Sequence, residues 1–226
     1  MLRKLANRVY YHAAGGDRRP VVYDIDQTRP ELRRLEAARG VIREELDAVL
    51  PDRSAIPRYH EIDPGRAHIS SDADTGWRVF LLYAMGLKPA DNRARCPRTV
   101  EVLDTLPDLF QAFFSILEPG KSVPPHVSPY FGYLRYHLPL IVPAENPPWM
   151  QIRDVEHHWR EGEGLLFDDD WDHEVHNRSE GVRVVLCVDI LRPMPWHADL
   201  LNRVVTRTAI RWGYARRMGA KNASFG

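Results

Sequence analysis

Two histidines and one arginine carry the side chains whose types and spacing point most directly to chemistry. His126 follows a Pro-Pro pair, His173 ends the run Phe-Asp-Asp-Asp-Trp-Asp-His, and Arg183 stands in an otherwise apolar run shortly afterwards. A neutral imidazole is a good ligand for iron, zinc or copper. A planar guanidinium binds a carboxylate through two parallel hydrogen bonds. The three residues therefore predict a metal centre with an anchor for an anionic cosubstrate.

The third metal ligand is missing from this pattern. Non-haem iron oxygenases commonly hold their metal with two histidines and a carboxylate, which normally stands two residues after the first histidine, where this chain has Ser128. Asp170 or Asp172 could substitute, although a residue next to a ligand on a strand points to the opposite face. By itself, a widely separated pair among ten histidines also fits ordinary core or surface histidines.

The sequence around these residues resembles the aspartyl/asparaginyl β-hydroxylase family, whose members are iron(II) and 2-oxoglutarate oxygenases on a double-stranded β-helix. The resemblance covers roughly residues 77–195, and its motifs are specific because they agree in order and spacing over several separated strands. The segments that carry it are residues 114–126, 133–140, 167–175 and 182–189.

The resemblance implies a role for each candidate residue. Part of the family uses two histidines and no carboxylate, with a small residue at the third position, and Ser128 matches that subgroup. His126 and His173 are then expected to be the only protein ligands of Fe(II), with cosubstrate and water completing the site. The family pattern places the 2-oxoglutarate contacts at Ser115, Arg135, His137 and Arg183.

The cosubstrate residues also fit purely structural roles. A buried guanidinium without a partner is costly, so a bound anion would account for Arg183 in its apolar run, but Asp189 or Glu174 could also pair with it. Arg135 and His137, two apart on one strand, should share a face. Taken without the family, Arg135 also fits a strand residue beside an acidic neighbour, and Ser115 an ordinary strand serine.

The acidic run before His173 also has two interpretations. Residues 168–170 fit a turn that caps the strand before the ligand, and they also fit carboxylates that orient a ligand imidazole; we favour the turn. Nearby aromatic and imidazole side chains are assigned to packing of the barrel or its mouth rather than to catalysis. These are His157, His158, Trp159 and Trp171.

The elements that must position these residues follow from hydrophobic periodicity. Leucine, isoleucine and valine recur at helical intervals over residues 31–50, which predicts an amphipathic helix ended by Pro51. Residues 51–75 are rich in Pro, Asp, Ser and Gly and predict a long loop or lid. A buried strand is expected over residues 77–85 and a short helix over residues 97–106.

Short β-rich runs follow, separated by Pro, Gly, Asn and Asp. They are expected at residues 110–117, 133–142, 150–155, 164–167, 173–177 and 182–191. So many short strands predict a mainly β fold with flanking helices, a jelly-roll barrel of the double-stranded β-helix type. We expect residues 1–76 to form a helical region packed on the barrel, residues 77–195 the oxygenase core, and residues 196–226 a basic amphipathic helix.

Composition restricts the classes of partner and location. Acidic and basic residues balance at 31 each, so no general field attracts nucleic acid. Two cysteines, Cys96 and Cys187, suit a reducing compartment, and a cytoplasmic location is expected. No apolar stretch is long enough to span a bilayer. The C-terminal tail, with Arg203 and Arg207 beside an apolar face, predicts either peripheral contact with an anionic membrane or packing of a terminal helix on the barrel.

The expected reaction is hydroxylation of an unactivated C–H bond, coupled to conversion of 2-oxoglutarate and O2 to succinate, as the resemblance implies. Residues 77–86, 92–99 and 191–195 are most similar to a bacterial branch that includes lipid A acyl-chain hydroxylases. The substrate is therefore an acyl lipid, an Asp or Asn side chain of a peptide, or a small amino acid. A catalytically silent metal-binding jelly roll is the alternative from another class.

Overall fold

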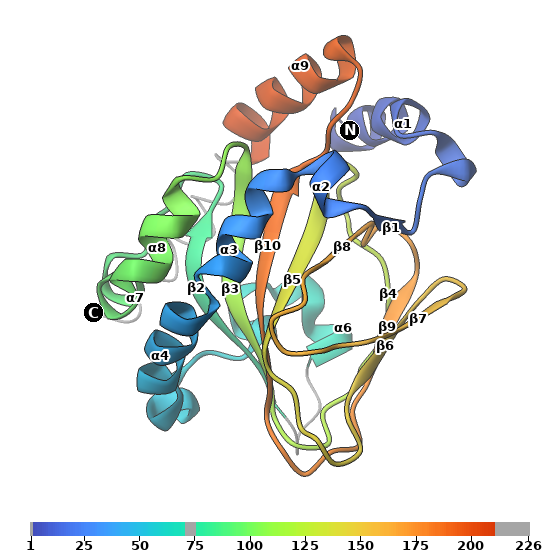
Figure 1. The fold of residues 1–226 in the computed structure, drawn as a ribbon. Coiled ribbons are helices and arrows are strands. Elements are labelled where there is room, and N and C mark those ends of the chain that lie inside the picture. Colours follow the sequence, from blue (N-terminus) through green and yellow to red (C-terminus); the bar gives the residue numbers. More distant parts are fainter. Residues whose placement is uncertain (1, 71–75, 211–226) are drawn as a thin grey trace.

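The computed structural model describes residues 2–70 and 76–210, in which two antiparallel β-sheets face each other (Figure 1). The larger sheet has six strands in the order β1-β8-β5-β10-β3-β2, and the smaller has four in the order β4-β9-β6-β7. The strands of the larger sheet are β1 (Val22–Tyr23), β2 (Trp77–Ala84), β3 (Leu109–Leu117), β5 (Tyr133–Ile141), β8 (Leu165–Phe167) and β10 (Arg183–Leu191). Those of the smaller sheet are β4 (Val123–His126), β6 (Trp149–Ile152), β7 (Val155–His158) and β9 (His173–His176).

The order in which the chain visits the two sheets defines the fold. From β3 to β10 the chain alternates between the larger and the smaller sheet, with β6 and β7 forming a hairpin within the smaller one. Neighbouring strands are consequently distant in sequence, as in the pairing of β10 with both β3 and β5. This winding is a double-stranded β-helix with flanking helices, which confirms the predicted fold class.

Helices cover the outer face of the larger sheet. Leu35, Ile42, Leu46 and Val49 recur at helical spacing, are fully buried, and pack against outward-facing strand residues such as Tyr136. The single helix expected over residues 31–50 is interrupted: it comprises α3 (Arg33–Ala37) and α4 (Arg39–Val49), separated at Ala38, whose φ of −89° and ψ of 5° lie outside helical values. The helix α8 (Pro97–Asp104), predicted from sequence, completes this layer.

The space between the two sheets holds a second core, and this is where the candidate residues lie. Its apolar members include Phe113 and Leu117 from β3, Cys187 from β10, and Met150 and Val175 from the smaller sheet. Alternation along each strand sends one set of side chains into this space and the other toward the helices.

A third core closes one end of the barrel. The N-terminal helix α1 (Leu2–Ala13) packs against α9 (Trp196–Val205), and their buried residues Ala6, Tyr10 and Ala198 contact Tyr130 and Tyr133 (Figure 1). The predicted C-terminal helix is confirmed over α9, followed by a π-helical turn at Thr206–Ile210. The remainder of that prediction, beyond residue 210, lies outside the described residues.

Two predictions for local structure need correction. Residues 51–70 are not a continuous loop, because they form the short helices α5 (Tyr59–Ile62) and α6 (Ala67–Ser70) and two 3₁₀ segments, 50–55 and 64–66. Buried apolar residues spaced too far apart to show periodicity, Ile56, Tyr59 and Ile69, hold this segment on the barrel. The strands β1, β4 and β7 were not predicted. Strand β1 has only two residues, β4 contains two prolines, and β7 is mostly polar.

Candidate active site

The two candidate metal ligands meet across adjacent strands of the smaller sheet. His126 ends β4 and His173 begins β9, and the two residues are direct partners in the antiparallel register. Their ring centroids are 4.1 Å apart. The Nδ1 of His126 donates to the carbonyl of Pro124 at 2.9 Å, and that of His173 donates to the carbonyl of Trp171 at 2.9 Å. Each ring therefore carries its proton on Nδ1, and Nε2 is the nitrogen whose lone pair is suited to bind a metal.

The position of β4 explains the Pro-Pro pair that precedes His126. Pro124 and Pro125 have no N–H to donate, and β4 is an edge strand of its sheet, where such residues are tolerated. Only Val123 and His126 are registered against β9. The prolines restrict the backbone immediately before the ligand and supply the carbonyl that fixes its tautomer.

The four predicted cosubstrate residues lie on three neighbouring strands of the larger sheet. In the register, Ser115 of β3 is opposite Val185 of β10, and Arg183 is two residues before Val185 and so shares its face. On the other side of β10, His137 of β5 is opposite Cys187. Arg135 lies two residues before His137 on the same strand. All four side chains therefore occupy the inner face, opposite the sheet that carries the histidine pair.

Arg183 is a buried arginine whose guanidinium lacks hydrogen-bond partners at two of its nitrogens among the described residues. Its side chain is 2% exposed, and the two nitrogens are Nε and Nη1. The guanidinium lies over the ring of Trp159, with 4.5 Å from Cζ to the centroid. Burial lowers the pKa of Arg183 to about 9, which is the direction expected for a buried cation without an anion. The pairing partners considered from sequence are engaged elsewhere, Asp189 with Arg135 and Glu174 with His176.

His137 and Ser115 are equally suited to receive a polar ligand. The Nδ1 of His137 is buried and has no partner among the described residues. Burial first, and then the nearby charge of Arg183, lower the pKa of His137 well below 6.5, so the ring is neutral. The indole of Trp77 donates to the Ser115 hydroxyl oxygen at 2.9 Å, so that hydroxyl can donate its own proton to a further acceptor.

Arg135 differs from the other three residues because its guanidinium is already paired. Its Nε and Nη2 donate to the two oxygens of Asp189 at 2.8 and 2.9 Å, and its Nη1 lies 3.2 Å from the carboxylate of Asp169. Burial would lower the pKa of Arg135, but the neighbouring negative charges, Asp189 first and also Asp169, outweigh it and raise the pKa well above its usual value. A direct cosubstrate contact for this residue stays a prediction.

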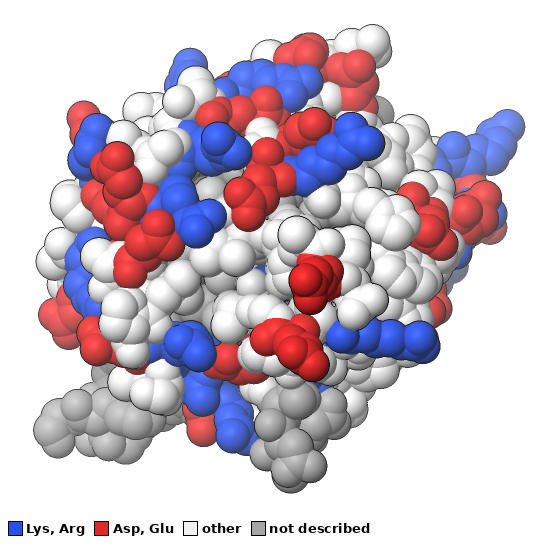
Figure 2. All heavy atoms as spheres, turned by 60° about the horizontal axis from the view of Figure 1, so that its bottom comes forward, with Lys and Arg blue, Asp and Glu red and all other residues white. Residues whose placement is uncertain are grey.

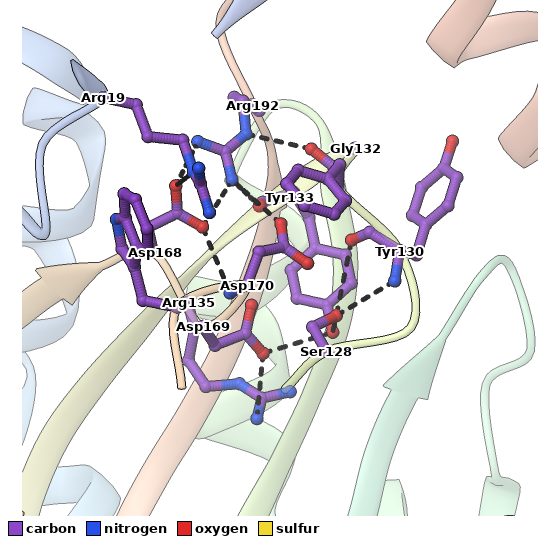
Figure 3. A network of polar contacts seen from close by, with 12 residues as sticks. Arg19, Ser128, Tyr130, Gly132, Tyr133, Arg135, Asp168, Asp169, Asp170 and Arg192 are labelled. Carbon is purple, nitrogen blue, oxygen red and sulfur yellow. Dashed lines mark hydrogen bonds and ion pairs between the residues drawn. The ribbon is translucent and has the colours of Figure 1, made fainter. Parts of the chain in front are cut away.

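Residues 168–170 form the centre of a buried ionic network (Figure 3). Arg192 donates to both oxygens of Asp168, at 2.7 and 2.8 Å, and to Asp170 at 3.1 Å; Arg19 donates to Asp168 at 2.9 Å. Asp168 also accepts from the backbone N–H of Asp170, as the turn interpretation predicts. The network fixes the segment immediately before His173.

The same network reaches Ser128, the residue at the third-ligand position. The N–H of Ser128 donates to the carbonyl of Asp169 at 2.9 Å, and its buried hydroxyl lies 2.7 Å from the Tyr133 hydroxyl (Figure 3). Tyr133 in turn donates to the carboxylate of Asp169 at 3.3 Å. The turn at residues 168–170 thus supports the backbone near both histidines. It ends three residues before His173, and it is hydrogen-bonded to Ser128, two residues after His126.

The residues present fit a metal with a carboxylate cosubstrate. The imidazoles of His126 and His173 have the tautomer that leaves Nε2 unprotonated. On the opposite sheet, Nε and Nη1 of Arg183 and Nδ1 of His137 are buried without hydrogen-bond partners among the described residues. Across residues 2–70 and 76–210, no group of three or more His, Cys, Asp or Glu side chains is arranged to hold a metal. A surface cavity of about 390 Å³ between α8 and α9 contains none of the candidate residues.

Three contributors to the site were missed in the sequence. Trp159, assigned to general packing, lies against the Arg183 guanidinium; Arg192 and Tyr133 connect residues 168–170 to the rest of the site. Arg192 offered one signal, since it directly follows a fully apolar strand end and a buried arginine requires acidic partners. The contacts of Trp159 and Tyr133 depend on strand pairing and have no local signature.

Comparison with known proteins finds a matching family and several similar proteins. The aspartyl/asparaginyl β-hydroxylase family matches residues 36–193. Over 192 residues the chain is 39% identical to the ornithine lipid ester-linked acyl 2-hydroxylase of Rhizobium tropici, covering 84% of this chain and 67% of that protein. It is 31% identical to the human aspartyl/asparaginyl β-hydroxylase over 129 residues, covering 55% of this chain but only 16% of the human protein.

The chain belongs to the aspartyl/asparaginyl β-hydroxylase family, a family of hydroxylase enzymes, and the resemblance drawn from its sequence is confirmed. The match begins at residue 36 rather than near residue 77, so it includes the helices that cover the larger sheet. Among solved structures, the viral collagen prolyl hydroxylase of Paramecium bursaria Chlorella virus 1, in complex with 2OG, is a distant likeness. It has 11% identity and a TM-score of 0.39, covering 67% of this chain and 91% of that one.

Proposed function

We propose that this protein is an Fe(II)- and 2-oxoglutarate-dependent dioxygenase that hydroxylates an unactivated C–H bond. The observation that carries the proposal is the buried guanidinium of Arg183, whose Nε and Nη1 have no partner within the described residues, on the sheet opposite two imidazoles with fixed tautomers. A dicarboxylate that chelates a metal through its 2-oxo end has a second carboxylate that needs such a cation.

Each residue then has a defined task. His126 and His173 would hold Fe(II) through Nε2, and Arg183 would bind the distal carboxylate of 2-oxoglutarate with the hydroxyl of Ser115. His137, neutral and buried, would contribute a hydrogen bond from a ring nitrogen. When bound, the metal and its cosubstrate supply the oxidising power for C–H hydroxylation, with O2 as co-reactant and succinate as coproduct.

The surrounding protein positions these groups and excludes water. Ser128 leaves the third-ligand position to water or cosubstrate, and its backbone is held by the carbonyl of Asp169. Trp159 covers one face of the Arg183 guanidinium, so the anchor works in a medium from which water is largely removed. The arrangement pre-organises charge and orientation, which are the protein's contribution in cofactor enzymes.

Succinate formation tests the proposal. Purified protein with Fe(II), O2 and 2-oxoglutarate is assayed against acyl lipids, Asp- or Asn-containing peptides and free amino acids, with His173→Ala as the control. The proposal expects substrate-stimulated succinate that the variant does not form. If no substrate and no slow uncoupled turnover yield succinate above the His173→Ala level, the catalytically silent metal-binding jelly roll is the better account.

An acyl lipid is the substrate class that a specific observation favours. The Rhizobium tropici relative, named as an ornithine lipid acyl 2-hydroxylase, aligns over most of this chain, whereas the human relative named for Asp and Asn aligns over about half. None of the helices in the described part of the chain combines the length and hydrophobicity that a bilayer crossing requires. Peripheral contact through the C-terminal helix is therefore part of the lipid proposal, and a cytoplasmic location stays a prediction.

A further inference from the structure

Apolar side chains of the described residues are exposed mainly on one helix pair. Among the residues whose exposure the structure describes, four of the six exposed large hydrophobic residues belong to α1 and α9, and Trp196 has the highest exposure of these six, 78%. The four are Leu5, Trp196, Leu200 and Val204. On α9 they are spaced by four residues, which places them along one side of the helix.

This exposed stripe is distinct from the side of α9 that packs on the barrel. Ala198, Asn202 and Val205 are buried, so the helix already satisfies its structural contact with the other face. The sequence predicts one apolar face for the tail; the structure divides it, with Leu200 outward and Val205 inward. Packing on the barrel does not explain a second apolar stripe that faces water, and exposed apolar patches of this kind mark interaction sites.

The exposed charges of α1 are basic, and α9 adds no net charge because its Asp199 and Arg203 pair with each other. On α1, Lys4, Arg8 and His12 are exposed at intervals of four, and this helix has no acidic residue. The only acid of α9, Asp199, is paired with Arg203 at 2.7 Å. The face seen in Figure 2 is different, because there acidic and basic side chains are interspersed.

Helices α1 and α9 are hydrogen-bonded to the loop that follows His126. The Asn7 amide donates to the carbonyl of Pro129 at 3.0 Å, and the Asn202 amide donates to the carbonyl of Gly132 at 2.6 Å. A Cβ on Gly132 would lie 2.4 Å from Asn202, so the loop and α9 approach as closely as glycine allows. The loop starts directly after His126, and its Val127 is 49% exposed.

We propose that α1 and α9 together form a docking surface for an anionic lipid bilayer, next to the loop that borders the metal site. The stripe of Trp196, Leu200, Val204 and Leu5 would enter the boundary between headgroups and acyl chains, and Lys4 and Arg8 would contact anionic headgroups. This inference rests on the proposed lipid substrate, because docking here places the bilayer beside the residues that follow His126.

Vesicle co-sedimentation of the full chain tests the surface. We expect binding to vesicles that contain phosphatidylglycerol, weaker binding to pure phosphatidylcholine, and loss of binding at high salt. The double variant Trp196→Ser with Leu200→Ser should lower the partition coefficient at least tenfold, whereas Val22→Ser, at an exposed position on β1, should leave it unchanged. Lys4→Glu with Arg8→Glu should also lower the partition coefficient, with Arg98→Glu and Arg160→Glu as the charge-matched control.

Separate readouts distinguish this inference from the proposed function. The iron and 2-oxoglutarate affinities, measured without vesicles, should match the wild type in every surface variant, which also shows that each variant is folded. If the wild-type chain does not bind anionic vesicles, or if both surface variants bind them as well as their controls, the docking surface is wrong. Concentration-dependent dimerisation that Trp196→Ser with Leu200→Ser abolishes, without vesicle binding, would assign the stripe to a second copy instead.

Discussion

At the scale of single residues, Arg183 differs from Arg135 in its pairing with carboxylates. Both are interior arginines on the inner face of the larger sheet. Arg135 pairs with two carboxylates, whereas the Nε and Nη1 of Arg183 have no hydrogen-bond partner among the described residues. Burying a cation without an anion is expensive unless a ligand compensates. The difference supports the proposed role of Arg183 as the anchor of an anionic cosubstrate, and it shows that Arg135 links β5, β10 and the turn at residues 168–170.

Replacing Arg183 should therefore affect the cosubstrate more than the metal. For Arg183→Ala we expect the Kd of 2-oxoglutarate to rise by about 30- to 1000-fold, the equivalent of about 2–4 kcal/mol for charge-assisted hydrogen bonds. The Kd of Fe(II) should change far less. Anaerobic calorimetry with Arg160→Ala, a control at an exposed arginine, measures both constants; a larger loss of iron affinity than of cosubstrate affinity would contradict the assignment.

At the scale of elements, the turn at residues 168–170 lies between β8 and β9 and is hydrogen-bonded to the segment that follows β4, so it contacts both strands that carry the candidate ligands. Its side chains bind Arg192 and Arg19, and its backbone accepts from Ser128. Because His173 follows by three residues and His126 precedes Ser128 by two, one network supports the backbone close to both imidazoles. Hydrogen bonds that support the residues around a metal ligand also orient the ligand.

Removing one partner of this network should be costly. Arg192→Met leaves the carboxylates of Asp168 and Asp170 buried with fewer hydrogen bonds, so the free energy of unfolding should fall by about 3–5 kcal/mol. Arg33→Met removes contacts to Asp26 and Glu36 that are partly exposed to solvent, and its effect should be much smaller. Urea denaturation of the metal-free variants measures both losses, and equal losses would remove the special role of the network.

The elements also show how far the sequence was informative. Long apolar strands such as β3, β5 and β10 were predicted because an uninterrupted hydrophobic run marks them. Motifs marked His126 and His173 as a candidate pair, and the structure places their rings next to each other. The edge strand β4 was missed because two of its four residues are prolines. The partners of Arg192 and the cover provided by Trp159 follow from pairing between distant strands, which local periodicity does not encode.

At the scale of the whole molecule, buried neutral histidine makes stability depend on pH. Burial lowers the folded-state pKa of His137 well below 6.5. Below about pH 6.5, His137 is therefore protonated in the unfolded chain while it stays neutral in the folded chain. The contribution of the neutral His137 ring to the free energy of unfolding is present above the unfolded-state pKa of the ring and is lost as the pH falls below it.

The metal-free protein should accordingly lose stability between about pH 7.5 and about pH 5.5. The share of His137 approaches about 1.4 kcal/mol per pH unit below its unfolded-state pKa. His137→Gln should flatten the pH dependence by that amount, while His12→Gln, at an exposed position, should leave it unchanged. Chemical denaturation at a series of pH values provides the measurement, and an unchanged slope for His137→Gln would show that the ring is not held neutral.

Formation of the complex of protein, iron and 2-oxoglutarate is the decisive test of the roles proposed for His126, His173 and Arg183. Anaerobic addition of Fe(II) and 2-oxoglutarate to the full chain should produce the weak visible charge-transfer band of a metal-chelated 2-oxoacid. The band should be absent in His126→Ala and His173→Ala, and should require much more 2-oxoglutarate in Arg183→Ala. A wild-type protein that shows no band at saturating iron and 2-oxoglutarate would contradict the account.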